Sequence, residues 1–147
     1  MIHIEVKSFS DLTTDELYNI LQLRSEIFVV EQDCVYQDMD FKDQKAFHLM
    51  GLKNNQLVAY TRIFKPGDYF DEASIGRVVV AKNERQFKHG YDIMNASIAY
   101  IANEFNISKI KISAQEYLKA FYSNLGFIQV GEPYLEDGIP HIAMVRN

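Results

Sequence analysis

The chain has 147 residues, a length typical of one folded domain, and we expect a single domain over residues 1–147. Hydrophobic residues make up 48% of the chain and charged residues 24%, an ordinary globular composition that excludes a disordered or fibrous protein. The net charge is −5 and the basic residues are scattered, which argues against a nucleic-acid-binding surface.

Location is indicated by the cysteine content and by the hydropathy of the chain. No uncharged apolar run approaches the ~20 residues that a membrane span needs, and the opening "MIHIEVKSF" lacks the apolar segment of a signal peptide. Cys34 is the only cysteine, so no disulfide forms within the chain, which favours a reducing compartment. We therefore expect a cytoplasmic protein that does not contact a membrane.

The elements of the first half follow from residue periodicity and turn chemistry. Their predicted ranges are strand 2–9, helix 12–32, and strands 47–53, 56–64 and 73–81. The helix begins with a capping box, in which Thr13 is the N-cap and Glu16 stands three residues later. The pair Asn54-Asn55 tolerates positive φ, so it predicts a tight hairpin between the second and third strands.

The segment that follows the first helix is acidic. Only Lys42 offsets its five carboxylates, which are Glu31, Asp33, Asp38, Asp40 and Asp43. One interpretation is a solvated loop. The other is a negative rim that attracts a cationic substrate, because grouped charge raises the local concentration of the opposite sign.

A short basic loop then separates a strand from a helix. It holds Arg85, Lys88 and His89 and ends at Gly90, and apolar residues recur at helical spacing over 91–105. A helix N-terminus leaves backbone N–H groups unpaired and carries partial positive charge, so it suits a diphosphate. The alternative is an ordinary strand-to-helix connection, and neither a P-loop nor a dinucleotide fingerprint is present.

The remaining elements complete an α+β pattern. They are strand 109–114, helix 116–125 with Gly126 as its C-cap, strand 127–135, a turn at 136–140 and strand 141–147. The order is β-α-β-β-β-α-β-α-β-β, with one strand–helix–strand crossover near the centre. This order predicts a mixed sheet flanked by helices.

Two motifs in this order resemble the GNAT superfamily of acyl-CoA N-acyltransferases. Its pattern is a strand, [Q/R]-x-x-G-x-[G/A], a helix, a strand, and then N-x-x-A-x-x-x-Y-x-x-x-G-F. The matching positions here are Arg85 and Gly90 in the first motif and Tyr122, Gly126 and Phe127 in the second. The departures are Lys88, Gln115 and Leu118, which stand where the pattern has glycine, asparagine and alanine.

Longer stretches narrow the resemblance to the ElaA-like branch of this superfamily. They are "LQLRSEIFVVEQDCVYQDMD", "HLMGLKNNQLVAYTRI", "IGRVVV", "AFYSNLGF" and "EDGIPHIAM", and they cover most of the chain in the right order. That branch also tends to carry lysine in place of the first loop glycine, as at Lys88.

The resemblance implies a fold, a reaction and a donor site. The fold is a mixed, mostly antiparallel sheet of about seven strands with about four helices, and the reaction moves an acetyl group directly from acetyl-CoA to an amine without a metal. The implied cofactor-binding residues are Val78, Val79 and Val80 along the thioester, Arg85, Gln86, Phe87, Lys88, His89 and Gly90 at the pyrophosphate, and Gln115. Tyr122 matches the tyrosine that protonates the departing thiolate, although its spacing alone also fits a core aromatic.

The acceptor side is less marked in the sequence. Glu31 could bind the amine or accept its proton, or it could be a solvated helix end. His48 and His141 could each line the acceptor cleft or be ordinary hydrogen-bonded histidines, and two histidines do not make a zinc site. Arg62 and Arg77 lie in predicted strands, and their possible partners are Glu31, Asp40 and Glu136.

Three functions therefore stay open. The first is an acetyl-CoA-dependent N-acetyltransferase acting on a cationic amine, with Tyr122, Glu31 and His48 as its catalytic candidates. The second is a non-catalytic acyl-CoA-binding module, and the third is a related enzyme that uses a longer acyl donor. An intact Tyr122 favours an enzyme. The last two strands could also pair across a homodimer.

Overall fold

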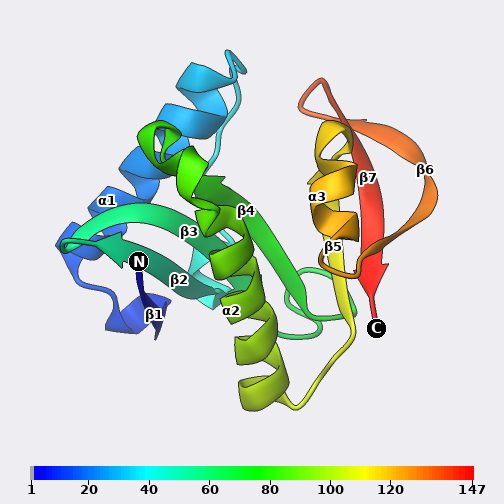
Figure 1. Cartoon of the computed structure of the whole chain (residues 1–147), viewed down its shortest axis with the longest axis horizontal. Helices are drawn as coiled ribbons and strands as arrows, with labels where there is room; N and C mark the ends of the chain where they lie inside the picture. The colour runs from blue at the N-terminus through cyan, green and yellow to red at the C-terminus, as the bar shows by residue number, and fades with distance from the viewer. Residues whose placement is uncertain (1) are drawn as a thin grey trace.

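The computed structural model describes residues 2–147, which form seven strands in two sheets with helices on both sides (Figure 1). The first sheet has the order β1-β2-β3-β4, with bounds His3–Ser8, Phe47–Lys53, Gln56–Phe64 and Ser74–Val80. The second has the order β5-β7-β6, with bounds Ile110–Gln115, Ile139–Arg146 and Ile128–Glu136. Neighbouring strands within each sheet are antiparallel, and the α+β fold expected from the sequence is confirmed.

Three α-helices and several shorter helical segments connect these strands. The α-helices are α1 (Thr14–Arg24), α2 (His89–Phe105) and α3 (Lys119–Ser123). The 3-10 turns are Phe9–Asp11, Asp43–Lys45, Lys82–Phe87 and Glu116–Leu118. Within the described chain, no helix combines the length and the apolar character that crossing a bilayer would require.

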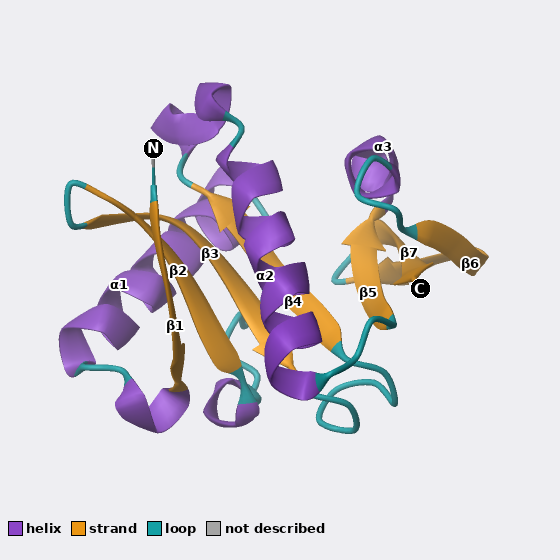
Figure 2. Ribbon diagram, turned by 60° about the horizontal axis from the view of Figure 1, so that its bottom comes forward, coloured by secondary structure: helices purple, strands orange, loops and turns teal. Residues whose placement is uncertain are grey.

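The two sheets meet at one point and then diverge. Ala73 and Ile110 form a parallel bridge, and the Lys111 N–H donates to the Ala73 carbonyl oxygen at 2.9 Å. Beyond it, no backbone pairing joins β4 to β5 within residues 2–147, so both strands present open edges to each other. Figure 1 shows β4 and β5 separating from this common end, and Figure 2 shows α3 and the second sheet standing apart from α1, α2 and the first sheet.

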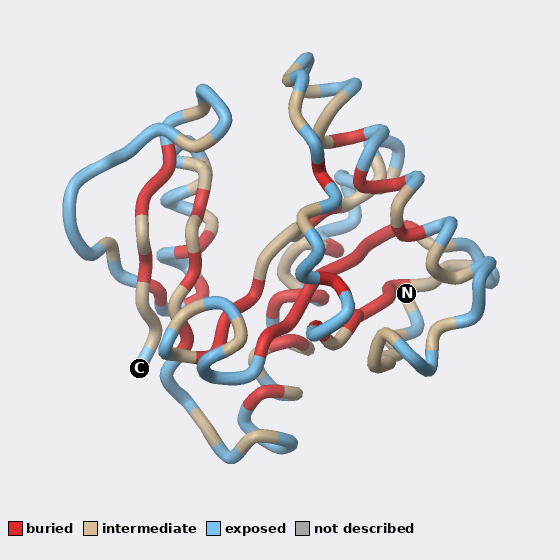
Figure 3. Tube along the Cα trace, turned by 180° about the vertical axis from the view of Figure 1, so that it is seen from behind, coloured by how far each residue is buried: buried red, intermediate tan, exposed pale blue. Residues whose placement is uncertain are grey.

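The core lies on both faces of the first sheet and on one face of the second. One apolar cluster packs α2 and α3 against Ile63 and Ile75 of the first sheet and Ile112 and Met144 of the second. A smaller cluster packs α1 against the opposite face of the first sheet. Figure 3 shows this burial running along the central strands, while the connecting loops are exposed.

Two local predictions are confirmed in detail. The Thr13 hydroxyl accepts from the Glu16 N–H at 3.1 Å and the Glu16 carboxylate accepts from the Thr13 N–H at 2.8 Å, which completes the capping box. Asn54 and Asn55 have φ values of 53° and 64°, as a two-residue hairpin turn with positive φ at both positions requires.

The first helix differs from the expectation in its last turns. The predicted helix 12–32 is α-helical only to Arg24 and continues as a π-helix over Ser25–Glu31. The Gln32 N–H, for example, donates to the Ile27 carbonyl five residues earlier, at 3.1 Å. Apolar spacing does not distinguish a π turn from an α turn over so short a stretch. Such turns occur often at functional sites.

Strand β4 carries an irregularity where it leaves its neighbour. Tyr60 pairs with Val79 and Arg62 pairs with Gly76, so two residues of β4 oppose the single residue Thr61. This is a β-bulge, which bends a strand and leaves backbone groups unpaired. Arg77 stands in it with φ of 49°, a left-handed conformation that is unusual for a residue with a side chain.

Candidate functional site

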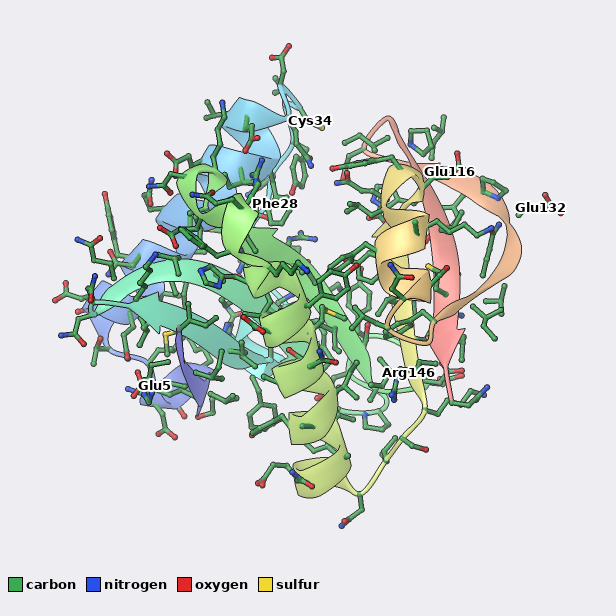
Figure 4. All side chains as sticks on the ribbon, in the orientation of Figure 1. Glu5, Phe28, Cys34, Glu116, Glu132 and Arg146 are labelled. Atoms are coloured by element: carbon green, nitrogen blue, oxygen red, sulfur yellow. The ribbon has the colours of Figure 1, made fainter. Side chains whose placement is uncertain are left out.

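A cleft of about 610 Å³ opens where the two sheets diverge. Its walls come from the π-helix, the open edges of β4 and β5, the start of α2, the α3 region and the β6–β7 hairpin. Figure 4 shows Phe28 and Cys34 on one side of the opening and Glu116, just before α3, on the other. The Cys34 thiol reaches across, within 3.4 Å of the Asp137 carbonyl oxygen in the hairpin turn.

The cleft touches both faces of the second sheet. Ile112 and Ala114 belong to the core cluster that includes α3, so they point to the α3 face. Side chains alternate along a strand, so Ser113, Gln115 and their neighbours point to the opposite face. We call this the far face. It comprises Ser113, Gln115, Tyr134 and His141, where His141 pairs with Gln115 on one side and Tyr134 on the other.

Tyr122 approaches the cleft from the α3 face. Its ring packs edge-on against Phe121 and Phe127 and is 6% exposed. Burial raises the pKa of its phenol well above the usual range, and the nearby Tyr117 adds to the shift. Among the hydrogen bonds found in residues 2–147, none involves this hydroxyl, so the phenol faces the cleft protonated and without a protein partner.

The predicted thioester strand lines the cleft as well. Val78, Val79 and Val80 all border it, along the edge of β4 that has no strand neighbour. Gln115 borders it from β5, where its side-chain amide lies 3.3 Å from that of Gln32 at the end of the π-helix. These residues therefore come together at one opening, although they are far apart in the sequence.

The predicted phosphate loop only partly faces the cleft. Arg85, Lys88 and Gly90 border it, whereas Gln86, Phe87 and His89 do not. His89 is buried beside Glu84, with its Nε2 3.2 Å from the carboxylate, so its imidazole points away from the opening. Helix α2 begins at His89, two residues before the expected start.

Lys88 holds the left-handed conformation at this junction. Its φ is 60°, a value that glycine adopts at little cost. This position corresponds to the first glycine of the GNAT pattern, so the backbone explains why the pattern has glycine there. The Lys88 N–H and side chain sit at the positive end of α2, where an anion is favoured.

Arg85 and Glu31 pair with each other across the mouth of the cleft. The Arg85 guanidinium donates two hydrogen bonds to the Glu31 carboxylate, both at 2.6 Å. The hydrogen bond from Arg85 lowers the pKa of the Glu31 carboxyl group. The candidate residue for phosphate and the candidate residue for the amine are thus paired with each other.

The acidic segment is neither a solvated loop nor a free negative rim. Three of its five carboxylates, Asp38, Asp40 and Asp43, pair with arginines in the interior. Asp43 accepts from Arg24 at 2.8 Å and from Arg62 at 2.9 Å. Both interpretations of the segment were therefore wrong for most of its charge, because the balancing cations come from distant elements. The expected pairing of Arg62 with Asp40 is confirmed at 2.9 Å.

His48 does not border the cleft. It is fully buried, its Nε2 donates to the Asp43 carbonyl oxygen at 2.9 Å, and its Nδ1 accepts from the Tyr60 hydroxyl at 2.6 Å. The expectation that it could line the acceptor cleft or act in catalysis is corrected, since both ring nitrogens are occupied and no substrate reaches them. Burial lowers the pKa of this imidazole, which keeps it neutral.

Sequence reasoning missed several residues of the cleft. Tyr36, Arg77, Ser113, Tyr117 and Glu136 all border it. Arg77 donates to the Asp38 carboxylate at 2.7 Å, so it also ties the acidic segment to the bulge of β4. No periodicity marks these positions, although Arg77 stands out as a charge within a β-branched strand. Among the described residues, no three His, Cys, Asp or Glu side chains gather as a metal site would need.

Comparison with known proteins identifies the family. A family model described as "Acetyltransferase (GNAT) domain" matches residues 11–147. The chain is 42% identical to the protein ElaA of Escherichia coli, over the whole chain and 97% of that protein. The chain belongs to the GNAT acetyltransferase family. The resemblance noted in the sequence is confirmed, and GNAT proteins use acyl-CoA as a substrate.

Solved structures agree with this membership. The crystal structure of an acyl-CoA N-acyltransferase from Pseudomonas aeruginosa superposes with a TM-score of 0.94 and 40% identity over all of both chains. The crystal structure of Escherichia coli ElaA gives a TM-score of 0.92 and 41% identity, also over all of both chains. The divergent sheets and the helices around the cleft are therefore the architecture of an acyl-CoA N-acyltransferase fold.

Proposed function

We propose that this chain is an acetyl-CoA-dependent N-acetyltransferase that acts on a primary amine, with residues 1–147 working as one domain. The observation that carries the proposal is the position of Tyr122 beside the open edge of β4. An unpaired strand edge and an unpartnered phenol both face one cleft, and the cleft leads to the N-terminus of α2.

Each part of the cleft has a chemical task in this proposal. Backbone N–H groups of Val78–Val80 and the bulge before them hold the pantetheine and polarise the thioester carbonyl, where an oxyanion develops. Lys88 and the backbone at Gly90 hold the pyrophosphate at the positive end of α2. Arg85 joins them once it leaves Glu31, whose carboxylate then faces the acceptor as the amine-binding candidate.

The reaction is a direct transfer. The amine nitrogen attacks the thioester carbon, the carbon–sulfur bond breaks, and the CoA thiolate takes the proton of the Tyr122 phenol. Burial raises the pKa of the Tyr122 phenol, so the hydroxyl carries its proton when the thiolate forms. Product amide and free CoA then leave, and the phenol regains a proton that the amine has released.

The test is the release of free CoA from acetyl-CoA in the presence of a panel of amines. Tyr122→Phe keeps the ring that packs against Phe121 and Phe127, so the melting temperature and the affinity for acetyl-CoA should stay near those of the parent. Its kcat should fall by ~10²–10⁴, the usual contribution of a positioned proton donor. Tyr18→Phe, a change at an exposed tyrosine on α1, is the matched control.

Two outcomes separate the competing functions, and a third tests the role of Tyr122. Acetyl-CoA binding without CoA release on any amine would favour the non-catalytic module. Faster release from a longer acyl-CoA than from acetyl-CoA would favour a different donor. A Tyr122→Phe variant within about twofold of the parent would make Tyr122 a core aromatic, and the thiolate would take its proton from water or another residue.

A homodimer through the last two strands stays part of the proposal. Strand β6 is an edge of the second sheet and carries Ile128 and Leu135 exposed, at 68% and 73%. Sedimentation of the parent and of Leu135→Lys checks it, because a dimer that pairs these edges should dissociate in the variant.

A further inference from the structure

A buried histidine on the far face is not used by the reaction as proposed. His141 is 7% exposed and borders the cleft, where it lies beside Tyr134 in a stacked arrangement with ring centroids 6.1 Å apart. Its place in strand β7 is central, between Gln115 of β5 and Tyr134 of β6. His141 is therefore an almost fully buried imidazole that still reaches the substrate cleft.

The hydrogen bonding of this ring fixes its tautomer. Nδ1 lies 2.7 Å from the carbonyl oxygen of Ile139. A carbonyl oxygen only accepts hydrogen bonds, so Nδ1 carries the proton and Nε2 holds a free lone pair in the neutral ring. Nε2 makes no hydrogen bond among the described residues. It is also not fully buried, since the fully buried nitrogens that lack a partner among those residues are Arg62 Nε and His89 Nδ1.

A carboxylate stands beside this lone pair. Glu136 Oε2 lies 3.5 Å from His141 Nε2, and Glu136 Oε1 accepts from the Ser113 hydroxyl at 3.4 Å. Tyr134 also hydrogen-bonds Ser113, so strands β5 and β6 hold the carboxylate and the ring in one network. When Nε2 takes up a proton, the imidazolium and this carboxylate stand as an ion pair with 3.5 Å between Nε2 and Oε2.

His141 and Tyr122 reach the cleft from opposite faces of the second sheet. Tyr122 belongs to the core cluster on the α3 face, whereas His141 lies on the far face. An acyl transfer needs a base for the attacking amine and an acid for the departing thiolate. Two groups on opposite faces of the second sheet, whose strand β5 borders the cleft, can therefore take the two tasks separately, one as base and the other as acid.

We propose that His141 is the general base that deprotonates the acceptor amine, with Glu136 as the residue that stabilises its protonated form; this rests on the proposed N-acetyltransferase function. The ammonium gives one proton to His141 Nε2 and the freed lone pair attacks the thioester carbon. The carbon–sulfur bond then breaks, Tyr122 protonates the thiolate, and the second amine proton restores the Tyr122 phenol. The imidazolium returns its proton to water.

The experiment measures kcat/KM against pH for acetyl transfer, with the parent and the variants His141→Gln and Glu136→Gln. The groups that could shape this profile around His141 are the stacked Tyr134, Glu136 and Asp137 on its own side of the cleft, and Cys34, Tyr36 and Arg77 across it. His141→Gln should lose about 100-fold or more and should lack the fall in rate on the acid side that the parent shows. Glu136→Gln should lose less than His141→Gln, because it removes the charge beside Nε2 but leaves the base itself.

Two controls keep the outcomes distinct. His3→Gln removes an exposed histidine on β1 and should match the parent throughout. Acetyl-CoA affinity should be unchanged in His141→Gln, because the base contacts the amine and not the donor. In parallel, the ¹⁵N spectrum of the parent's imidazole side chains should show His141 protonated at Nδ1.

If the parent transfers acetyl groups but His141→Gln keeps the acid-side fall and a rate within twofold, the role of His141 is refuted while the enzyme stands. An Nε2-protonated tautomer in the neutral ring refutes it as well. If the parent binds acetyl-CoA and transfers to no amine, the proposed function fails and the inference fails with it.

Discussion

Asp43→Asn tests whether the interior ion cluster holds the fold together. The cluster, defined by Arg24, Arg62, Arg77, Asp38, Asp40 and Asp43, contains three cations and three carboxylates. Asp43 is its bridge, because one carboxylate oxygen accepts from Arg24 and Arg62 together. The asparagine keeps the size and one oxygen but leaves two guanidiniums, 0% and 1% exposed, one charge short.

The size of the effect follows from that burial. Breaking a buried ion pair by removing one partner costs about 3–5 kcal/mol, because the remaining charge stays in a poor solvent. The free energy of unfolding of a whole protein is about 5–15 kcal/mol, so this loss is a large share of it. At about 2–4 °C per kcal/mol for a chain of this size, the melting temperature should fall by roughly 6–20 °C.

The assay is thermal and urea unfolding followed by circular dichroism at pH 7. Asp33→Asn, a change at an exposed acid in the same segment, is the control and should move the melting temperature by less than about 2 °C. If Asp43→Asn behaves like Asp33→Asn, water or a rearranged carboxylate satisfies the arginines, and the cluster is not a net source of stability.

The pH dependence of the same cluster carries a sign that can be checked. Burial alone would raise the pKa of the Asp43 carboxyl group, but the hydrogen bonds and charges of Arg24 and Arg62 outweigh it and lower the pKa. A lowered folded-state pKa gives stability that is present above the unfolded value of ~3.9 and is lost as the pH falls through the folded value. As the pH falls below about 4, the free energy of unfolding of Asp43→Asn should therefore decrease less than that of the parent.

Three further predictions concern the cleft and a buried histidine. Glu31→Gln should tighten acetyl-CoA binding by up to about fivefold, because an exposed ion pair is worth ~0–1 kcal/mol and the change frees Arg85 for the pyrophosphate. Calorimetry measures the affinity, with Glu26→Gln as the control. Unchanged affinity would mean that Arg85 does not contact the donor. Gly90→Val should weaken that binding more than Gly90→Ala does, since an added Cβ already meets the Phe121 ring at 3.4 Å; equal affinities would argue against a donor at this junction. Burial lowers the pKa of His48, so the imidazole takes up a proton on unfolding when the pH is below the unfolded value of ~6.5. The free energy of unfolding should therefore fall from pH 7 to pH 5. In urea titrations His48→Gln should remove that pH dependence, and an unaltered pH dependence would assign it to other groups.

The parts of the fold that could be predicted are those that neighbouring residues determine. Capping at Thr13 needs only Glu16 three residues later, and the hairpin at Asn54-Asn55 needs only residues that tolerate positive φ. The order of the strands and helices also followed from the spacing of the apolar residues. The motif residues around Gly90 and Tyr122 could be found for the same reason, since each motif lies within one short stretch.

The parts that could not be predicted depend on partners distant in the sequence. Asp43 looked solvated because its cations, Arg24 and Arg62, lie 19 residues away on either side. His48 looked available because the sequence does not show that Tyr60 and the Asp43 carbonyl occupy both of its nitrogens. The expectation that His141 could line the cleft is confirmed, but the sequence could not separate it from His48, because its access to the cleft depends on β5 and β6.

The ion cluster also explains how β4 keeps its shape beside an open cleft. A strand gains rigidity from neighbours on both sides, and β4 loses one of them beyond Ala73, where the cleft begins. Arg77 stands there in a left-handed conformation, which needs support from its surroundings. Its guanidinium donates to the Asp38 carboxylate at 2.7 Å and to the Asp38 carbonyl oxygen at 2.9 Å.

Asp38 in turn accepts from Arg24 on α1 at 2.8 Å, so the bulge of β4 is tied through one carboxylate to the helix on the other side of the sheet. These ion pairs hold β4 in place where it has no neighbouring strand. Buried ion pairs contribute little net stability compared with apolar packing, but they define a geometry. In this fold the ion pairs define a geometry in which the edge of Val78–Val80 stays open to the cleft. The cleft then meets Tyr122 on one face of the neighbouring sheet and His141 on the other.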